Sequence, residues 1–465
     1  MKIKALSRTS QQCTRECVGD LKKVTRNLNP DANPFQKARE YTRAVTSAKL
    51  DRMFAKPFIA GLEGHSDGIM VSCRSRKNLR PLVSGSGDGE VRVWDLASQR
   101  CMVKYSNAHT GWVTGLVEAT GGSSDQLQIP MFYSCGMDGY IKLWKFNGPD
   151  ANNFTFDDKQ SDDGLVNSWR YEKGSFKSMD HHWQDREQFA TSSDHAVEIW
   201  NPNRSVPIQT FQLWGDDSVN VVRYNPAESC LLAHCSSDRG IGLHDVRAGS
   251  GLKKTVLTMK SNCLEWNPME PQKFVVGNED FNCYSFDMRK LATPYQIHKG
   301  HIGAVLSVSW SPTGREFVSG SYDKTIRIFN LKGGTAREIY HTKRMQRVFT
   351  VNYSSDHRFI VSGSDDTNLR IWKARASEKI GQVTAREEKA FNYRSTLVKK
   401  YKHMSEVKKI VHHRRVPKLI KKQTAIAHVQ KESARRKQSN RVKHSKPGTV
   451  GFKDERKSIV VREML

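Results

Sequence analysis

The residues of this 465-residue chain best suited to catalysis or metal binding are its histidines and a glycine-rich turn. The adjacent pairs His181-His182 and His412-His413 are weak candidates for metal ligands, because neighbouring side chains do not face one way on a strand or a helix. Residues 332–335 are typical of a hairpin turn and lack the spacing of a phosphate-binding loop. The sequence contains no H-E-x-x-H zinc motif and no G-x-S-x-G nucleophile elbow. We therefore expect a protein that is not an enzyme, with no metal, cofactor or small-molecule substrate.

The nine cysteines and the hydropathy pattern indicate whether the protein folds inside or outside the cell. The closest cysteine pairs, Cys13/Cys17 and Cys230/Cys235, have no second pair or histidine at zinc-site spacing, so we expect reduced thiols. No stretch approaches the roughly 18 apolar residues of a membrane span, and no signal peptide is visible. We expect a soluble intracellular protein with no membrane partner.

The net charge of +27 is unevenly distributed along the chain. Residues 1–55 carry +7, residues 375–465 carry +18, and the 319 residues between them carry only +2. We therefore predict three segments: a basic N-terminal arm (1–55), a nearly neutral middle domain (56–374) and a basic C-terminal domain (375–465).

The middle segment contains one short pattern seven times. Each copy has a turn aspartate and, six residues later, an aromatic residue or histidine that ends an alternating strand. The seven pairs are Asp88/Trp94, Asp138/Trp144, Asp194/Trp200, Asp238/His244, Asp280/Phe286, Asp323/Phe329 and Asp366/Trp372. Successive aspartates are 42 to 56 residues apart, close to the roughly 40–45 residues of a four-stranded propeller blade. The spacing predicts an all-β propeller of seven blades.

A closed ring removes exposed strand edges, and the sequence offers a strand that would close it. Residues 58–62 lie just before the first repeat, so we expect them to form the outermost strand of blade seven. The longest interval contains a polar, acidic stretch from Asn147 to Gly164, which we interpret as an exposed loop.

The repeats resemble the WD40 family, in which a His, a Ser or Thr, the turn Asp and the Trp form a buried hydrogen-bonded tetrad. A network of this kind is stable only when its buried polar groups are paired. The resemblance implies three tetrads: His65, Ser84, Asp88 and Trp94; His109, Ser134, Asp138 and Trp144; and His341, Ser362, Asp366 and Trp372. Blade six has Phe329 in place of the Trp, and blades three to five lack the Gly-His start.

After Trp372 the apolar pattern changes to helical spacing. A capping box at Thr384–Glu387 predicts one helix, and Pro417 predicts the start of a second that ends by Pro447. We therefore expect basic arms that are largely α-helical or extended. Cations follow both helices: Lys399, Lys400, Lys408, Lys409, Arg414, Arg415, Lys421, Lys422, Arg435, Arg436, Lys437, Arg441, Lys443 and Lys446.

Such a basic segment could be a solvated helix face or a nuclear-import signal. A charge of +18 on 91 residues with few carboxylates instead favours binding to a polyanion, through phosphate contacts that carry little sequence specificity. An acidic protein could fill the same role. A membrane surface is less favoured, because the apolar positions lack an aromatic-rich face.

The amino-acid sequences of both arms resemble those of the WD-repeat and SOF-domain-containing protein family. The matching motifs are Arg26–Pro30, Pro34-Phe35, Ala38–Tyr41, Lys49–Phe58, Ala376–Gly381, Lys400–His403 and Arg441–Gly448. The resemblance implies a nuclear and nucleolar scaffold of the small-subunit processome. Its partners would be precursor rRNA, a box C/D small nucleolar ribonucleoprotein and other processome proteins.

A second function also fits part of the sequence. Asp245 with Arg247 and Asp287 with Arg289 follow the third strands of consecutive blades. They resemble the W-D-x-R boxes by which some WD40 proteins dock onto an adaptor of a cullin-RING ubiquitin ligase. Asp-x-Arg turns also occur as plain surface ion pairs, worth about 0–1 kcal/mol. Ligase docking would need one edge of the propeller, whereas ribosome assembly would need the arms.

Overall fold

We describe the structure of the chain from a computed structural model. It describes residues 34–76, 78–119, 131–145, 164–171, 174–185, 187–212, 218–249, 251–446, 448–451 and 454–464. The chain divides into two compact units, one of residues 58–374 with 415–465, the other of residues 1–57 with 375–414. This division differs from the three consecutive segments predicted above, because the basic C-terminal segment contributes to both units.

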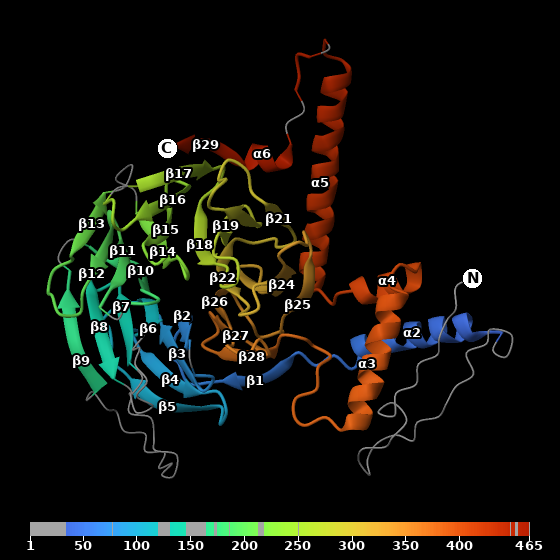
Figure 1. Cartoon of the computed structure of the whole chain (residues 1–465), viewed down its shortest axis with the longest axis horizontal. Helices are drawn as coiled ribbons and strands as arrows, with labels where there is room; N and C mark the ends of the chain where they lie inside the picture. The colour runs from blue at the N-terminus through green and yellow to red at the C-terminus, as the bar shows by residue number, and fades with distance from the viewer. Residues whose placement is uncertain are drawn as a thin grey trace, which may run out of the picture. The chain divides into compact units, whose positions relative to one another are not determined.

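The larger unit is a ring of seven antiparallel sheets around a central axis (Figure 1), which confirms the predicted seven-bladed propeller. Blades one to three consist of β2 (Ile69–Arg74), β3 (Pro81–Ser86), β4 (Val91–Asp95) and β5 (Arg100–Tyr105); β6 (Val113–Glu118), β7 (Met131–Gly136), β8 (Tyr140–Lys145) and β9 (Leu165–Arg170); and β10 (Phe176–His181), β11 (Phe189–Ser193), β12 (Ala196–Trp200) and β13 (Gln209–Gln212). Blades four and five consist of β14 (Val219–Tyr224), β15 (Leu231–Ser236), β16 (Gly240–Asp245) and β17 (Gly251–Leu257); and β18 (Ser261–Trp266), β19 (Lys273–Asn278), β20 (Cys283–Asp287) and β21 (Gln296–His298). Blades six and seven consist of β22 (Val305–Trp310), β23 (Glu316–Ser321), β24 (Ile326–Asn330) and β25 (Ala336–Tyr340); and β26 (Val348–Tyr353), β27 (Phe359–Ser364), β28 (Leu369–Lys373) and β1 (Phe58–Leu62).

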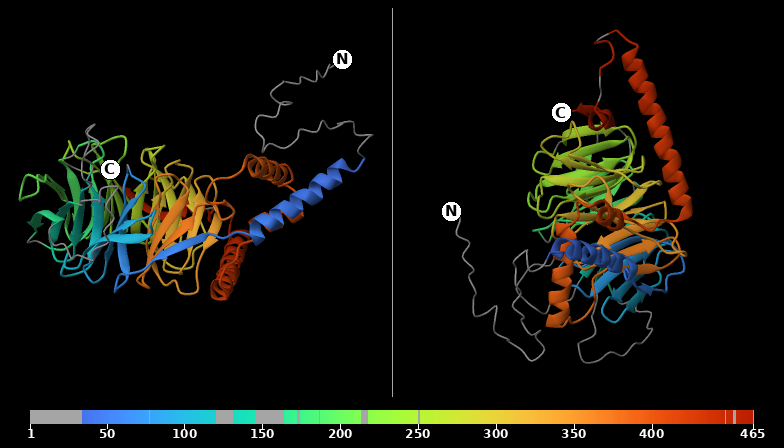
Figure 2. Two further views of the ribbon diagram at one scale, coloured as in Figure 1. Left: turned by 90° about the horizontal axis from the view of Figure 1, so that it is seen from below. Right: turned by 90° about the vertical axis from the view of Figure 1, so that its right-hand side faces the viewer.

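The first strand of each blade lines the axis. Each of these inner strands contacts the inner strand of the next blade, and β26 contacts β2, so the circle is complete. The register of each inner strand against its neighbour shifts between its first and third residues. Such an irregularity bends and twists a strand, which suits a steeply twisted blade. Seen edge-on, the ring is one layer of blades (Figure 2).

The ring closes with the predicted strand. β1 pairs antiparallel with β28, with Leu62 opposite Leu369, and forms the outer edge of blade seven. The Phe58 ring also meets the Trp372 indole edge-on, with centroids 5.6 Å apart. The first and last strands of the ring therefore hold each other in one sheet (Figure 1).

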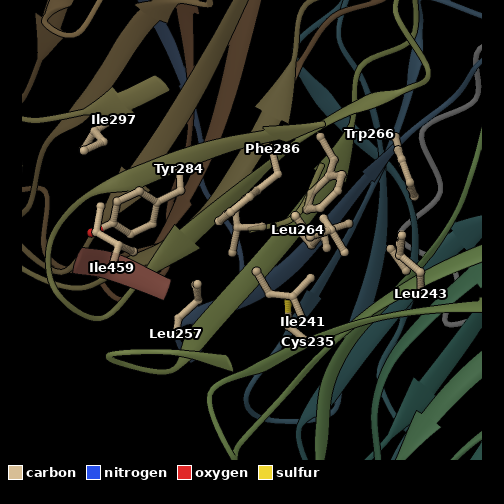
Figure 3. Close-up of a cluster of buried hydrophobic side chains, with 14 residues drawn as sticks. Cys235, Ile241, Leu243, Leu257, Leu264, Trp266, Tyr284, Phe286, Ile297 and Ile459 are labelled. Atoms are coloured by element: carbon tan, nitrogen blue, oxygen red, sulfur yellow. The ribbon is translucent and has the colours of Figure 1, made fainter. Parts of the chain in front are cut away.

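Blade four has a fifth strand that we did not predict. β29 (Val460–Met464) pairs antiparallel with β17, with Leu257 opposite Val460, and follows the short helix α6 (Glu455–Ile459). Ile459 lies in a buried apolar cluster with Leu257, Tyr284 and Ile297 (Figure 3). The last described residues of the chain are thus packed onto blades four and five.

The smaller unit is helical and joins both arms of the sequence. It contains α2 (Gln36–Met53), α3 (Ala385–Lys400) and α4 (Ser405–His412), and α2 contacts both of the others. Small and apolar side chains form its interior: Ala44, Ser47 and Ala48 from α2, Leu397 from α3 and Val407 from α4. Thr384 caps α3 by accepting from the Glu387 N–H at 3.4 Å, as the capping box predicts.

The remaining helix of the C-terminal segment, α5 (Lys418–Lys443), belongs to the larger unit and begins after Pro417, as predicted. Two predicted features, the arm residues 1–33 and the acidic stretch up to residue 163, lie outside the described residues. Among the described helices, none has both the length and the apolar character needed to cross a bilayer.

Candidate polyanion-binding and partner-binding surfaces

Blade two brings its four predicted residues into one hydrogen-bonded chain. The Ser134 hydroxyl accepts from the Trp144 indole N–H at 2.8 Å and lies 2.7 Å from His109 Nε2. His109 Nδ1 lies 3.1 Å from both Asp138 oxygens. Because the single hydroxyl proton of Ser134 is needed for Nε2, the imidazole proton sits on Nδ1 and is donated to Asp138. Burial raises the pKa of Asp138, but the hydrogen bonds from His109 and two backbone N–H groups outweigh it and hold the pKa below the usual range.

Blade one brings together only three of its four residues. Ser84 lies 2.7 Å from both His65 Nε2 and the Trp94 indole nitrogen. Asp88 is exposed and instead accepts from the Ser66 and Ser86 hydroxyls. Among the described residues His65 Nδ1 has no hydrogen-bond partner, and Glu90 Oε2 lies 3.7 Å from it. Burial and then the Arg92 guanidinium lower the pKa of His65 to about 4, so the imidazole is neutral at pH 7.

His65, Asp88 and Glu90 are close enough together to be considered as metal ligands. Glu90, however, lies 2.9 Å from Arg92 Nη2 and 2.7 Å from Lys104 Nζ. Two fixed cations already neutralise this carboxylate, so a third positive charge would be repelled. The cluster is therefore better explained as an ion-pair network than as a metal site.

Blade seven does not bring His341 into its network. The Trp372 indole donates to Ser362 at 2.8 Å, but Asp366 accepts from Arg370 Nη1 at 2.9 Å instead of from a histidine. Blade six lacks the Trp but keeps the contacts of the histidine with the serine and the aspartate. His301 lies 2.7 Å from Ser319 and 3.0 Å from Asp323. Gly-His precedes the blades of His65 and His301, and a Cβ on Gly64 would strike the Arg92 guanidinium. His341 follows Tyr340, but the missing glycine is no signal against it, because His109 follows Ala108 and still joins its network.

The contrast between blades one and two gives a test of the network. Asp138→Ala should lower the free energy of unfolding by about 1–3 kcal/mol, because the buried Nδ1–H group of His109 loses its acceptor. Asp88→Ala should cost less, since that carboxylate is exposed and does not bond His65. Thermal unfolding of both variants at pH 7 measures the difference. Equal melting temperatures for the two variants would contradict the role given to Asp138.

The two Asp-x-Arg turns lie at equivalent places in blades four and five. Asp245 ends β16 and accepts from the Arg247 N–H at 2.9 Å, and Asp287 ends β20 and accepts from the Arg289 N–H at 3.0 Å. The Arg247 and Arg289 side chains are 76% and 64% exposed. Equivalent strands of a propeller run in one direction, so both turns open on the same face. Two guanidinium groups are therefore presented from consecutive blades.

The predicted basic residues fall into two groups. Lys399, Lys400, Lys408, Lys409 and Arg414 lie in the helical unit. Lys400 Nζ donates to Glu40 at 2.7 Å, and Arg414 Nη1 donates to the Val411 carbonyl at 2.6 Å, so both stabilise this unit. Lys399, Lys408 and Lys409 are exposed. Sequence periodicity could not separate these roles, because the partners of Lys400 lie about 360 residues away.

The other group is the larger one and lies mostly on α5. Its members are Arg415, Lys421, Lys422, Arg435, Arg436, Lys437, Arg441, Lys443 and Lys446, and all are exposed. The 26 residues of α5 hold nine Lys or Arg and a single carboxylate, Glu432, which lies 3.6 Å from Arg436. Ile420 is the one buried residue described on this helix. The helix spans about 39 Å and carries cations on every side.

A third set of charged residues was missed by the sequence analysis. Arg74, Arg223 and Glu265 lie at the ends of inner strands, on the wall of the central channel. No simple signal was available, because these inner strands mix polar and apolar side chains and Arg74 lies one position later in its strand than Arg223 and Glu265.

Two family models match the chain. The WD domain (G-beta repeat) matches residues 56–95, 100–145, 292–330 and 338–373, and the Sof1-like domain matches residues 374–460. The matched WD repeats omit blades three to five. The fold and these motifs define a WD-repeat propeller scaffold with a Sof1-like domain, which confirms the resemblance drawn from the sequence.

Relatives from distant organisms match over nearly the whole chain. The chain is 43% identical to "DDB1- and CUL4-associated factor 13" of Danio rerio over 462 residues, covering 99% of both proteins. It is 44% identical to the Mus musculus protein of that name over 461 residues, and 43% identical to that of Dictyostelium discoideum over 428. The chain belongs to the DDB1- and CUL4-associated factor 13 family.

Proposed function

We propose that this chain is a scaffold subunit of the nucleolar small-subunit processome that binds precursor rRNA through α5. The observation that carries the proposal is the charge pattern of this helix. Lys418/Lys422, Lys431/Arg435 and Lys437/Arg441 are like-charged pairs four residues apart. Such pairs face one another and destabilise a helix, and only Glu432 offsets them. A polyanion that lies along α5 would remove this repulsion.

The nearly neutral propeller then has a different task from the tail. Repeat rings offer broad faces to several protein partners, which suits contacts with a box C/D small nucleolar ribonucleoprotein and other processome proteins. The match of residues 374–460 to the Sof1-like domain supports this assignment. A nuclear and nucleolar location belongs to the same proposal.

Crosslinking tests the proposal directly. The full-length chain should crosslink to precursor rRNA in cells, with the crosslinked peptides concentrated in residues 415–446, and should sediment with large pre-ribosomal particles. A chain with α5 neutralised should lose the crosslinks and leave the particles. Crosslinks confined to the propeller faces would contradict the assignment to α5.

A second candidate function is supported by the names of the relatives and by the two exposed arginines. We propose that Arg247 and Arg289 dock the chain onto a DDB1-type adaptor of a CUL4 ubiquitin ligase. Arg247→Glu with Arg289→Glu should abolish co-purification with DDB1, because two cations at the edge of the interface become anions. The ring should remain folded, since both side chains are exposed.

The matched control changes two exposed arginines at the opposite ends of the strands, Arg239→Glu in the turn before β16 and Arg344→Glu in the loop before β26. This pair makes the same change in net charge away from the Asp-x-Arg turns and should leave DDB1 binding intact. Equal loss in both double variants would show a general charge effect. Retained binding by the Arg247/Arg289 variant would remove the docking hypothesis, and RNA binding should be unchanged in either case.

A further inference from the structure

Three hydroxyl side chains lie among the cations of α5: Thr424, Ser433 and Ser439. All three are exposed, but the residues that precede them differ. Arg436 and Lys437 lie three and two positions before Ser439. Basic residues at these positions fit the acidic substrate grooves of basophilic serine/threonine kinases, because complementary charge patterns set the specificity of a kinase for its substrate.

The other two hydroxyls suit such a kinase less well. Ser433 directly follows Glu432, a carboxylate that an acidic groove repels. Thr424 does follow two lysines, but its hydroxyl donates to the Ile420 carbonyl at 2.7 Å, and Ile420 is buried. Phosphorylation of Thr424 would therefore require opening of the helical turn that holds this buried side chain.

Ser439 lies in a part of α5 that can open readily. A kinase holds its substrate in an extended conformation, so the helix must open around the target hydroxyl. The helix ends at Lys443, about one turn beyond Ser439, and helix ends open at the lowest free-energy cost. The like-charged pair Lys437/Arg441 spans this turn and favours its opening. Ser439 thus combines a basic preceding sequence with an accessible hydroxyl.

A phosphate on Ser439 would have cations on both sides once the helix forms again. Residues three and four positions apart on a helix are neighbours. Arg435 and Arg436 lie four and three positions before Ser439, and Lys443 lies four positions after it. The single carboxylate of α5, Glu432, lies 3.6 Å from Arg436, so Arg435 and Lys443 have no acidic partner on this helix. A phosphate placed between them would supply one.

We propose that Ser439 is the target of a basophilic serine/threonine kinase and that its phosphate releases α5 from RNA. This inference rests on the RNA-binding function proposed above for α5. In the transfer step the Ser439 hydroxyl oxygen attacks the γ-phosphorus of ATP, the bond from that phosphorus to the ADP oxygen breaks, and an aspartate of the kinase accepts the hydroxyl proton. The products are phosphoserine and ADP.

The added charge acts against RNA binding in two ways. Phosphoserine carries about −1.5 to −2 charges at pH 7, so it repels the RNA backbone directly. It also pairs with Arg435, Arg436 and Lys443, which then no longer displace counterions from RNA. Loss of three such contacts should lower the slope of log affinity against log salt by about 2–3, and should weaken binding at 0.1 M salt on the order of a hundredfold.

The test treats the full-length chain with Mg-ATP and the catalytic subunit of cyclic-AMP-dependent protein kinase, a basophilic enzyme. We expect mass spectrometry to find phosphate at Ser439, and the treated chain to bind precursor rRNA with the smaller salt slope. Ser439→Ala should remove both effects of the kinase and leave RNA binding of the untreated chain unchanged. Ser433→Ala is the matched control on the same helix and should respond to the kinase as the unmodified chain does.

The proposal is overturned if no phosphate is found at Ser439, or if the salt slope is the same with and without it. Replacing the α5 cations by glutamine separates this result from a failure of the proposed function. If that replacement lowers the slope while phosphate does not, α5 binds RNA and only the control by phosphate is wrong. If the replacement also leaves the slope unchanged, both proposals are wrong.

A measurement in cells tests the regulatory role itself. The Ser439 phosphopeptide should be enriched in the chain that is free of pre-ribosomal particles, because the phosphate weakens the contact that holds the chain on RNA. Equal phosphate occupancy in the free and particle-bound chains would contradict this role.

Discussion

Binding of the chain to precursor rRNA should fall on the order of ten thousandfold at 0.1 M salt when five cations of α5 are replaced by glutamine. The five are Lys421, Lys422, Arg435, Arg436 and Lys437. Each cation that displaces a counterion from phosphate adds about 0.7–0.9 to the slope of log affinity against log salt. The slope should therefore fall by about 3.5–4.5, and the difference between the two chains should shrink towards 1 M salt. Binding measured across a salt series gives both quantities.

Glutamine has nearly the helix propensity of lysine and arginine, so the replacement removes charge without breaking α5. A matched control replaces five exposed cations of the propeller: Arg204, Arg315, Lys332, Lys343 and Arg344. It makes the same change in net charge and should keep most of the salt slope. If both sets reduce the slope equally, RNA senses only the total charge of the chain, and α5 has no special place in binding.

The propeller could be predicted from the sequence because its signal is local and repeated. Each turn aspartate precedes a strand at a fixed offset, so seven independent segments report the same supersecondary unit. Closure was also accessible, since Phe58–Leu62 precedes the first complete blade and a ring needs an outer strand for its last one.

The smaller unit could not be predicted in this way. It depends on contacts between α2 and the helices after the ring, such as Tyr41 Oη with Glu406 at 3.0 Å. The sequence of α2 contains no pattern that indicates a partner some 360 positions away. The two arms looked like separate basic segments for this reason, although residues 36–56 and 375–414 fold together.

The partners of the turn aspartates show a further limit. Sequence spacing locates the aspartate but not the cation that reaches it. Arg370 approaches Asp366 from four residues away, and in blade four Lys254 approaches Asp238 from the neighbouring strand. Either cation satisfies the carboxylate as a histidine would, so one backbone position tolerates several networks.

The pairing of the last strand, β29, should depend on the buried side chain of Ile459. Ile459→Ala should speed hydrogen exchange of the Thr258 amide and the β29 amides about thirtyfold, because losing this buried side chain costs about 2 kcal/mol of local stability. The Thr258 N–H donates to the Ile459 carbonyl at 3.1 Å and is exposed when β29 leaves. Exchange elsewhere in the ring should stay unchanged, since the other blades close without β29.

Val461 is the matched control, because it is a neighbouring residue with a side chain 62% exposed. Val461→Ala should leave exchange at Thr258 close to that of the unmodified chain. Equal effects of the two substitutions would mean that backbone pairing with β17, not the Ile459 contact with Tyr284 and Ile297, holds the end of the chain.

The outcome also decides how the tail should be studied. A chain cut after residue 414 loses α5 and β29 together, so loss of RNA binding in it would mix a charge effect with a change in blade four. Neutralising α5 while Ile459 stays in place separates the two.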